Sequence, residues 1–240
     1  MMRFIRGLIF SILFYGNTIA MAILGLPLLI LPQAVTFFWQ WLWARMMMIL
    51  LWLICGIRSR FEGERPDRQV IYAVKHQSAW ETIVLLALFG RPVTVMKRSL
   101  LWIPIFGFYL LRFGVMGIDR SQGKAALKHM IRVSQKAATT GRNLLIFPQG
   151  TRLAPGQEHP YHSGIYAIYA ATGLEVVPVA LNSGCFWPKD TIAKTPGEIV
   201  VSILPPIPPG LSRQELMQRL EEAIETESQR LIAAEHAASS

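Results

Sequence analysis

The fold is decided by the stretch Gln69-Val70-Ile71-Tyr72-Ala73-Val74-Lys75-His76-Gln77-Ser78-Ala79-Trp80-Glu81. Its first half, residues 69–75, is apolar and rich in β-branched side chains, which predicts a buried strand. The apolar run that follows predicts a helix over residues 79–89 that ends at Gly90. His76 therefore lies where a strand ends and a helix begins, the usual position of reactive groups in an α/β fold.

His76 and Glu81 are the candidate catalytic pair. A step of five residues turns a helix by roughly 500°, so the two side chains meet only if the chain bends between them, with Ser78 starting the helix. A carboxylate beside one imidazole nitrogen leaves the other nitrogen free to accept a proton. The alternative is a capping box over residues 78–81, in which Glu81 bonds only the backbone at the start of the helix.

The composition narrows the class of protein. The 240 residues suit one domain plus an appendage, and 52% hydrophobic with 16% charged residues is apolar for a soluble protein. The net charge of +9 suits an anionic partner. We expect phospholipid headgroups or a phosphorylated substrate and no nucleic acid, because no basic block interleaved with aromatic residues occurs. Cys55 and Cys185 are too few for a disulfide framework or a cysteine metal site.

The first 57 residues contain no Asp, Glu or Lys. Within them, residues 7–31 form an apolar run longer than the about 20 residues that cross a bilayer. The run also exceeds the roughly 15 residues of a signal-peptide core, and Pro27 and Pro32 occupy the region where cleavage residues would stand. We therefore predict a retained membrane anchor of two apolar helices over residues 1–57 and an α/β domain over residues 58–240.

The second apolar segment, residues 34–57, has two possible geometries. If it crosses the bilayer, Arg45 lies near mid-membrane at a cost of roughly 3 kcal/mol. If it lies in the interface, Arg45 reaches the headgroups. Arg58 and Arg60 follow, so both ends of the hairpin are positive. The positive-inside rule then places the catalytic domain on the cytoplasmic face of the cytoplasmic (inner) membrane.

Beyond the polar stretch 61–69, strand-like and helix-like segments alternate. This pattern predicts an α/β fold: a mixed, mostly parallel central sheet flanked by helices and preceded by the membrane-embedded hairpin. The expected strands are 69–75, 92–96, 113–118, 143–147, 175–181 and 198–204. The expected helices are 79–89, 122–139, 163–172 and 212–232.

Three of the expected strands are followed by a cation, namely Lys97, Arg120 and Arg152. If the strands are parallel, these cations gather at the same sheet edge as His76, where arginine forks match phosphate oxygens. For each cation alone, a surface salt bridge such as Asp119 with Arg120 is the alternative. No glycine-rich Walker loop occurs, so a nucleoside triphosphate is not indicated.

Arg152 follows a tight turn. Pro148 presets one backbone angle and Gly150 permits a positive φ, so the strand ends abruptly before Gln149-Gly150-Thr151-Arg152.

Taken in order, these motifs resemble those of the lysophosphatidic acid acyltransferases (1-acylglycerol-3-phosphate O-acyltransferases) within the glycerolipid acyltransferase superfamily. His76 and Glu81 match the first motif, with Glu in place of the commoner Asp, and Arg120 matches the end of the second. Residues 147–152 match the third motif, Phe-Pro-Glu-Gly-Thr-Arg, except that Gln149 replaces Glu. Residues 176–180 match the fourth, and the resemblance covers residues 69–183.

The resemblance implies transfer of a fatty acyl group from a thioester, without a cofactor, to the free sn-2 hydroxyl of 1-acylglycerol-3-phosphate. The product is phosphatidic acid for phospholipid synthesis, and the donor is either acyl-CoA or acyl-acyl carrier protein. The implied roles are His76 as general base oriented by Glu81, and Lys97, Arg120 and Arg152 as ligands of the acceptor phosphate. Gln149, Gly150 and Thr151 form the supporting turn, and no metal is expected.

Three alternatives stay open. The first is O-acyl transfer to another lysolipid, either a lyso-ornithine lipid or another lysophospholipid. The second is a metal-dependent hydrolase that uses His159 and His162, preceded by Glu158, although Pro160 between the histidines breaks a helix. The third is a non-enzymatic membrane scaffold whose motifs are only turns and caps.

Overall fold

The computed structural model describes residues 1–157 and 159–239, except for the side chains of residues 120, 238 and 239. Its centre is a seven-stranded sheet in the order β1-β7-β6-β2-β5-β3-β4. The strands are β1 (Ile57–Glu62), β2 (Ile71–Val74), β3 (Val93–Lys97), β4 (Met116–Ile118), β5 (Leu144–Ile146), β6 (Val176–Leu181) and β7 (Gly197–Ile203). All neighbouring pairs are parallel except β6 and β7. The expected mixed, mostly parallel sheet is confirmed.

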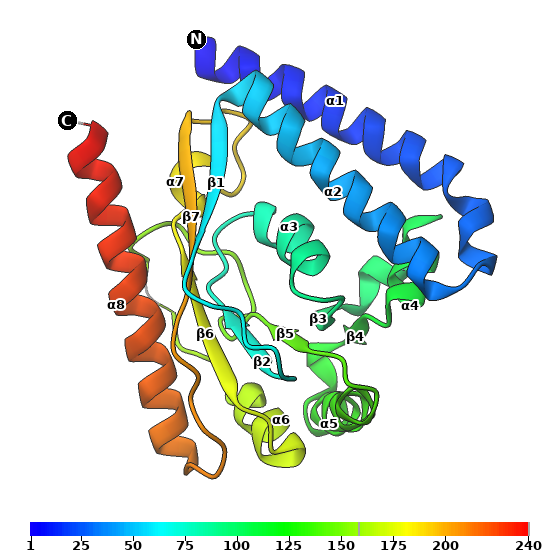
Figure 1. Ribbon diagram of the computed structural model, residues 1–240, viewed down its shortest axis with the longest axis vertical. Coiled ribbons are helices and arrows are strands. Elements are labelled where there is room, and N and C mark those ends of the chain that lie inside the picture. Colours follow the sequence, from blue (N-terminus) through cyan, green and yellow to red (C-terminus); the bar gives the residue numbers. More distant parts are fainter. Residues whose placement is uncertain (158, 240) are drawn as a thin grey trace.

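Helices cover both faces of the sheet (Figure 1). The α-helices are α1 (Met2–Leu24), α2 (Gln33–Cys55), α3 (Trp80–Leu88), α4 (Phe106–Phe113), α5 (Lys124–Thr139), α6 (Gly164–Thr172), α7 (Ser183–Phe186) and α8 (Arg213–Ser239). Short 3-10 helices are η1 (Leu26–Ile30), η2 (Arg98–Trp102) and η3 (Arg120–Gln122).

The alternating side chains of β2 show how the layers are built. Tyr72 and Val74 pack into a core with α2 and α3, whereas Ile71 and Ala73 pack into a second core with α6 and α8. Because both faces of a parallel strand are buried, its sequence is a continuous apolar run, which is why residues 69–75 could be recognised as a strand.

Two expectations about the elements were wrong. Strand β1 was not predicted, because only Gly56 separates it from α2 and every second residue of the strand is charged. It forms because it pairs in parallel with β7, beginning with Ile57 opposite Gly197. The expected strand 113–118 is a strand only from Met116, because α4 occupies residues up to Phe113. Helix α4 reads Phe-Gly-Phe-Tyr-Leu-Leu-Arg-Phe, and eight residues are fewer than the roughly 11–18 over which a helical period is recognised in a sequence.

The hairpin of α1 and α2 shares a core with the sheet. Ala44, Met47 and Leu51 of α2 and Phe10 of α1 belong to the same buried cluster as Val74 of β2. Both helices are long and apolar enough to cross a membrane by length and composition, and only 17% and 22% of their most apolar windows is buried. The hairpin therefore has one face in the protein core and one apolar face directed outward.

A close approach fixes the start of α1 against the rest of the protein. A Cβ atom at Gly7 would lie 1.9 Å from the carbonyl oxygen of Ile192, whereas a Cβ at Gly16 would meet nothing within 4 Å. Only glycine therefore fits at position 7.

We expect Gly7→Ala to lower the free energy of unfolding by about 1–3 kcal/mol, because overpacking displaces α1 from the loop at Ile192. Gly16→Ala is the matched control in the same helix; it leaves stability unchanged or raises it by up to about 1 kcal/mol through helix propensity. Thermal unfolding in detergent checks both variants. Equal midpoints for the two would contradict the close approach.

Candidate active site

The predicted site residues follow the carboxyl ends of parallel strands. His76 follows β2, the turn of residues 147–152 follows β5, and Lys97 ends β3. The two loops that follow β2 and β5 are hydrogen-bonded to each other at His76. Its backbone N–H donates to Oε1 of Gln149 (3.3 Å), and its carbonyl oxygen accepts from the N–H of Leu153 (2.9 Å). The sheet edge thus brings His76 and the turn together.

The imidazole of His76 lies beside a fully buried carboxylate. Nδ1 of His76 is 3.7 Å from Oε2 of Glu81, and the His76 side chain is 15% exposed. This distance is beyond a direct hydrogen bond, and Nδ1 has no hydrogen-bond partner among the described residues. The ring stacks on Phe147 with centroids 4.1 Å apart. Because Nδ1 faces Glu81, Nε2 is the nitrogen left to accept a proton.

Glu81 has the capping role as well as the position beside His76. Its carboxylate accepts hydrogen bonds from the backbone N–H groups of Gln77 (3.1 Å) and Ser78 (3.0 and 3.1 Å). The hydroxyl of Ser78 in turn accepts from the N–H of Trp80 (3.1 Å). The two interpretations of this stretch were therefore not exclusive, because the capping contacts are what hold the carboxylate at His76.

Ser183 is a site residue that the sequence analysis missed. Its hydroxyl donates to Oε1 of Glu81, and its side chain is fully buried at the start of α7. Ser183 follows β6, which lies next to β2 in the sheet. Its position after a parallel strand was the one available signal, since a single serine carries no motif.

The three predicted cations lie on neighbouring strand ends, but not all in one place. Arg152 is half-buried and lines a cavity together with His76. Lys97 is exposed, and its Cα pairs with Ile118 of β4. The backbone of Arg120 begins η3, two residues after Ile118, and its side chain is outside the described part of the structure. Only Arg152 is thus shown beside His76.

The turn before Arg152 has the expected geometry. Gly150 has a φ of 67°, and its N–H donates to the carbonyl of Phe147 at 2.9 Å. Thr151 is half-buried, and Gln149 is fully buried. The amide of Gln149 donates through Nε2 to Glu225 of α8 (3.3 Å) while its oxygen accepts from His76. Gln149 therefore connects the turn to two distant segments.

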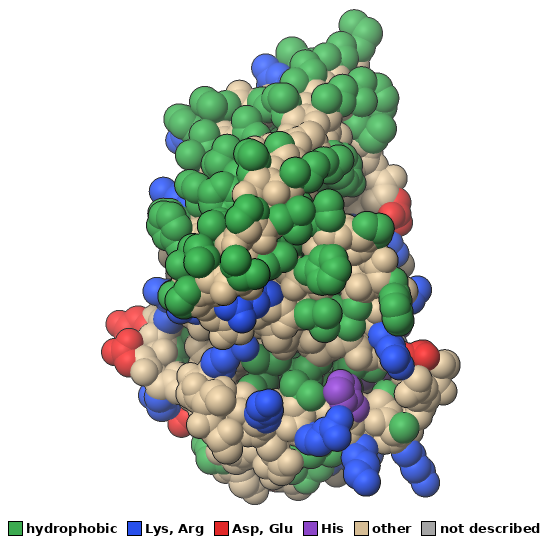
Figure 2. Space-filling model, turned by 90° about the vertical axis from the view of Figure 1, so that its right-hand side faces the viewer, with side chains coloured by type: hydrophobic (Ala, Val, Ile, Leu, Met, Phe, Trp, Pro, Cys, Tyr) green, Lys and Arg blue, Asp and Glu red, His purple; other side chains and the backbone are tan. Residues whose placement is uncertain are grey.

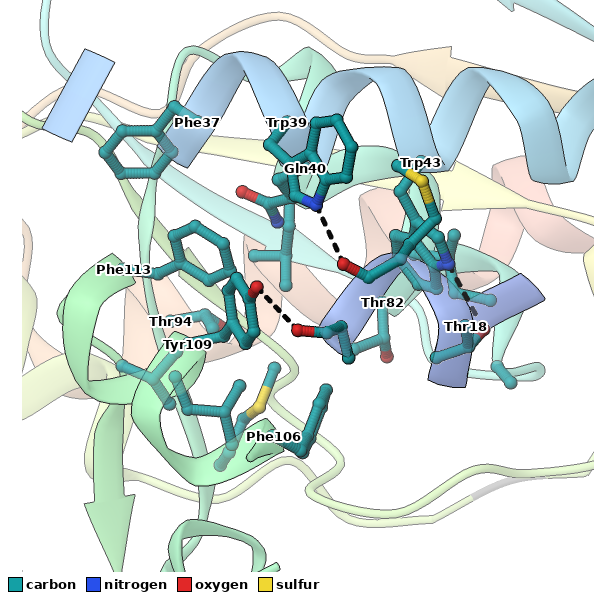
Figure 3. A pocket seen from close by; sticks show the side chains of 18 of the residues that line it. Thr18, Phe37, Trp39, Gln40, Trp43, Thr82, Thr94, Phe106, Tyr109 and Phe113 are labelled. Atoms are coloured by element: carbon teal, nitrogen blue, oxygen red, sulfur yellow. Dashed lines mark hydrogen bonds between the residues drawn. The ribbon is translucent and has the colours of Figure 1, made fainter. Parts of the chain in front are cut away.

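An apolar cavity of about 460 Å³ is lined by His76 and Arg152. Figure 3 shows part of its wall, with Phe37, Trp39 and Trp43 of α2 and Tyr109 and Phe113 of α4 labelled. The size of the cavity is within the roughly 300–1,000 Å³ of small-molecule sites. The walls come from α1, α2, α3 and α4 and include Phe14, Phe37, Trp39, Trp43, Tyr109 and Phe113. The sequence analysis missed this cavity because four separate helices form it.

The polar atoms of the aromatic wall residues are engaged with α1. Trp39 Nε1 donates to the carbonyl of Met21 (3.0 Å), Trp43 Nε1 to the hydroxyl of Thr18 (3.1 Å) and the hydroxyl of Tyr109 to the carbonyl of Ala22 (2.9 Å). These rings therefore present mainly carbon surface to the cavity, which suits a hydrocarbon chain.

The residues proposed for a metal hydrolase do not form a metal centre in the described part of the chain. The rings of His159 and His162 lie 6.0 Å apart, and Glu158 is outside the described residues. No group of three or more His, Cys, Asp or Glu side chains among the described residues could hold a metal ion. The geometry gives this alternative no support.

The fold and site define an α/β protein of the acyltransferase class. The structure superposes on the 1-acyl-sn-glycerophosphate acyltransferase of Thermotoga maritima with a TM-score of 0.79 and 23% identity, over 96% of this chain and 98% of that one. The family model described as Acyltransferase matches residues 57–182. The chain belongs to the Acyltransferase family.

Relatives at higher identity carry one name. The chain is 39% identical over 165 residues to the 1-acyl-sn-glycerol-3-phosphate acyltransferase of Pseudomonas aeruginosa, covering 68% of this chain and 64% of that protein. It is 30% identical over 162 residues to the enzyme of the same name from Cocos nucifera, covering 66% and 52%. The matched region therefore spans between about half and two thirds of these relatives.

Proposed function

We propose that the protein transfers a fatty acyl group from an acyl thioester to the sn-2 hydroxyl of 1-acylglycerol-3-phosphate and so forms phosphatidic acid. One observation carries the proposal: His76, beside the buried carboxylate of Glu81, lies with Arg152 at an apolar cavity large enough for a small-molecule substrate. A base, a cation and a hydrocarbon-binding cavity are the three features that acyl transfer to a phosphorylated lysolipid requires.

His76 acts as the general base. A hydroxyl is a poor nucleophile at neutral pH, so Nε2 takes its proton while the oxygen attacks the thioester carbonyl. The new C–O bond forms, the C–S bond breaks, and the leaving thiolate receives the proton. Glu81 stabilises the imidazolium in between, because its charge lies 3.7 Å from Nδ1. The attack is direct, since the chain has no Gly-x-Ser-x-Gly nucleophile elbow.

The acceptor is held by its phosphate and its chain. Arg152 offers a planar fork for phosphate oxygens at the site, and Lys97 and Arg120 supply further charge from the neighbouring strand ends. Fixing the phosphate places the free hydroxyl near His76, which converts a bimolecular step into an oriented one. The apolar cavity takes an acyl chain. No cofactor is needed, and acyl-CoA and acyl-acyl carrier protein are both suitable donors.

Membrane attachment follows from the outward faces of the hairpin and α4. The α/β part packs on α2 near both ends of the helix: Phe37 contacts Phe113 of α4, and Leu51 shares a core with the sheet. A helix packed in this way cannot cross a bilayer without carrying charged surface into the hydrocarbon. The hairpin instead lies along the membrane with its outward apolar face in lipid, and Arg45 is exposed beside Trp41.

Helix α4 and η2 extend this apolar surface. Trp102, Phe108 and Leu111 are 78%, 62% and 60% exposed, and α4 is joined to the hairpin by hydrogen bonds between Arg112 and the segment 31–33. Figure 2 shows apolar side chains over the upper part of the molecule, where Figure 1 places α1 and α2, and Lys and Arg side chains gathered below. Such a basic margin suits anionic headgroups on the cytoplasmic face of the inner membrane.

We expect His76→Ala to lower the rate of acyl transfer by at least roughly 10²–10⁴-fold, because the hydroxyl loses its proton acceptor. Thiol release from both donors, with lysophosphatidic acid as acceptor, measures the effect. His129→Ala on α5 is the control histidine outside the site. Undiminished transfer by the His76 variant, with the wild type active, would reject the mechanism.

We expect Arg152→Ala to raise the apparent KM for lysophosphatidic acid by roughly 10- to 100-fold, which corresponds to a charge-assisted hydrogen bond of about 1.5–3 kcal/mol. The KM for an acceptor without phosphate, lyso-ornithine lipid, stays unchanged. Steady-state kinetics with both acceptors measures the split, and Lys128→Ala on the exposed face of α5 is the control. A pure loss of kcat would show that Arg152 does not bind the phosphate.

We expect Trp102→Ser combined with Phe108→Ser to weaken binding to vesicles that contain anionic phospholipids by at least roughly tenfold, because burying one such side chain contributes about 1.5–3 kcal/mol. Vesicle flotation at limiting lipid measures the partitioning. Phe61→Ser in β1, an exposed aromatic residue (38%) outside this surface, is the control. Equal partitioning of both variants would place α4 outside the lipid.

A further inference from the structure

An ion pair that the mechanism does not use lies next to the catalytic edge and joins a buried lysine to a partly buried glutamate. Lys75, the residue before His76, is 2% exposed, and its Nζ lies 2.6 and 2.5 Å from the two carboxylate oxygens of Glu225 in α8. Oε1 of Glu225 also accepts from the hydroxyl of Tyr161 (2.8 Å) and from Nε2 of Gln149 (3.3 Å). We call Lys75, Gln149, Tyr161 and Glu225 the Glu225 cluster.

The Glu225 cluster is linked to the backbone of the site. Gln149, while donating to Glu225, accepts the backbone N–H of His76. Next to Tyr161, the N–H of His162 donates to the carbonyl of Pro148 at the start of the turn (2.9 Å). One carboxylate on the C-terminal helix therefore connects to the residue before His76, to the N–H of His76 and to the turn that carries Arg152.

The charges of the Glu225 cluster sum to zero, so a second carboxylate would give the cluster an excess negative charge. Lys75 supplies one positive charge, Glu225 supplies one negative charge, and Gln149 is neutral. Tyr161 stays a neutral donor, because burial and the charge of Glu225 raise its pKa far above the ordinary value. Removing Glu225 would leave the buried ammonium of Lys75 without its counter-charge, which is unfavourable. A glutamate at position 149 would bring a second carboxylate to within contact distance of Glu225, at the position where the Gln149 amide now donates.

We propose that Glu225 is a positioning residue for acyl transfer. It acts through Lys75 and Gln149 to hold His76 and the turn of residues 147–152 in fixed positions relative to each other. The same geometry suits an amide at position 149, because α8 already supplies the negative charge beside Lys75 and the amide can donate to it. The inference rests on the proposed function, because its readout is the acyl-transfer rate.

Moving the negative charge between the two positions tests the proposal. Glu225→Gln leaves Lys75 without its counter-charge, and Gln149→Glu places a second carboxylate beside that of Glu225. We expect each single variant to lower kcat roughly 10- to 100-fold, the cost of a misplacement of about 1 Å, while the KM for lysophosphatidic acid changes less than threefold. The double variant, Gln149→Glu with Glu225→Gln, regains one cation and one anion. Its kcat is expected within about threefold of wild type.

Two further variants complete the experiment. Glu222→Gln, at an exposed position of α8, is the matched control and should leave kcat and the melting temperature unchanged. Tyr161→Phe removes one hydrogen bond to the Glu225 carboxylate without changing any charge. It should lower kcat roughly tenfold, as expected for loss of a hydrogen bond to a charged group, and it serves as the test if the charge variants do not fold.

The outcomes separate the two proposals. If the wild-type protein transfers no acyl group, the proposed function fails. If the wild type is active and Glu225→Gln keeps its kcat, the positioning role is rejected. A double variant that regains the melting temperature but not kcat would also reject it, because the cluster would then stabilise the fold alone. If the charge variants do not fold and Tyr161→Phe keeps the wild-type kcat, the positioning role is likewise rejected.

Discussion

The site depends on one interaction, the satisfaction of a fully buried carboxylate. Glu81 has no exposed surface, and burying an unpaired charge is costly. Two backbone N–H groups at the start of α3 and the hydroxyl of Ser183 offset that cost. These donors force the bend between His76 and α3, and Ser183 joins the loop after β6 to the loop after β2. The local capping of one helix thus determines where the imidazole lies.

Around this point, different parts of the chain contribute different chemistry. The parallel strands deliver the polar groups to one edge, because the carboxyl ends of parallel strands meet there. The hairpin and α4 contribute the apolar walls, and their aromatic side chains direct polar atoms toward α1 and carbon surface toward the cavity. The C-terminal helix contributes a counter-charge for Lys75. The polar groups, the apolar walls and the counter-charge thus come from different parts of the chain, and His76 lies where these parts meet.

The sequence predicted what depends on local patterns. Continuous apolar runs identified β2, β5 and β6, and the spacing of His76 and Glu81 with the turn before Arg152 indicated the edge site. What it could not predict depends on pairing across the chain. Strand β1 exists because β7 pairs with it, Ser183 matters only because β6 adjoins β2, and the cavity needs four helices. Glu225 could not be recognised, since a glutamate on an amphipathic helix is usually solvated.

The core that α2 shares with the sheet has a consequence for any fragment that lacks the two N-terminal helices. Cleavage near Gly56, between α2 and β1, would leave the sheet-side partners of Ala44, Met47 and Leu51 facing water, including Val74 two residues before His76. The hairpin therefore belongs to the same folding unit as the sheet edge that carries His76, and its removal would expose core residues beside that edge.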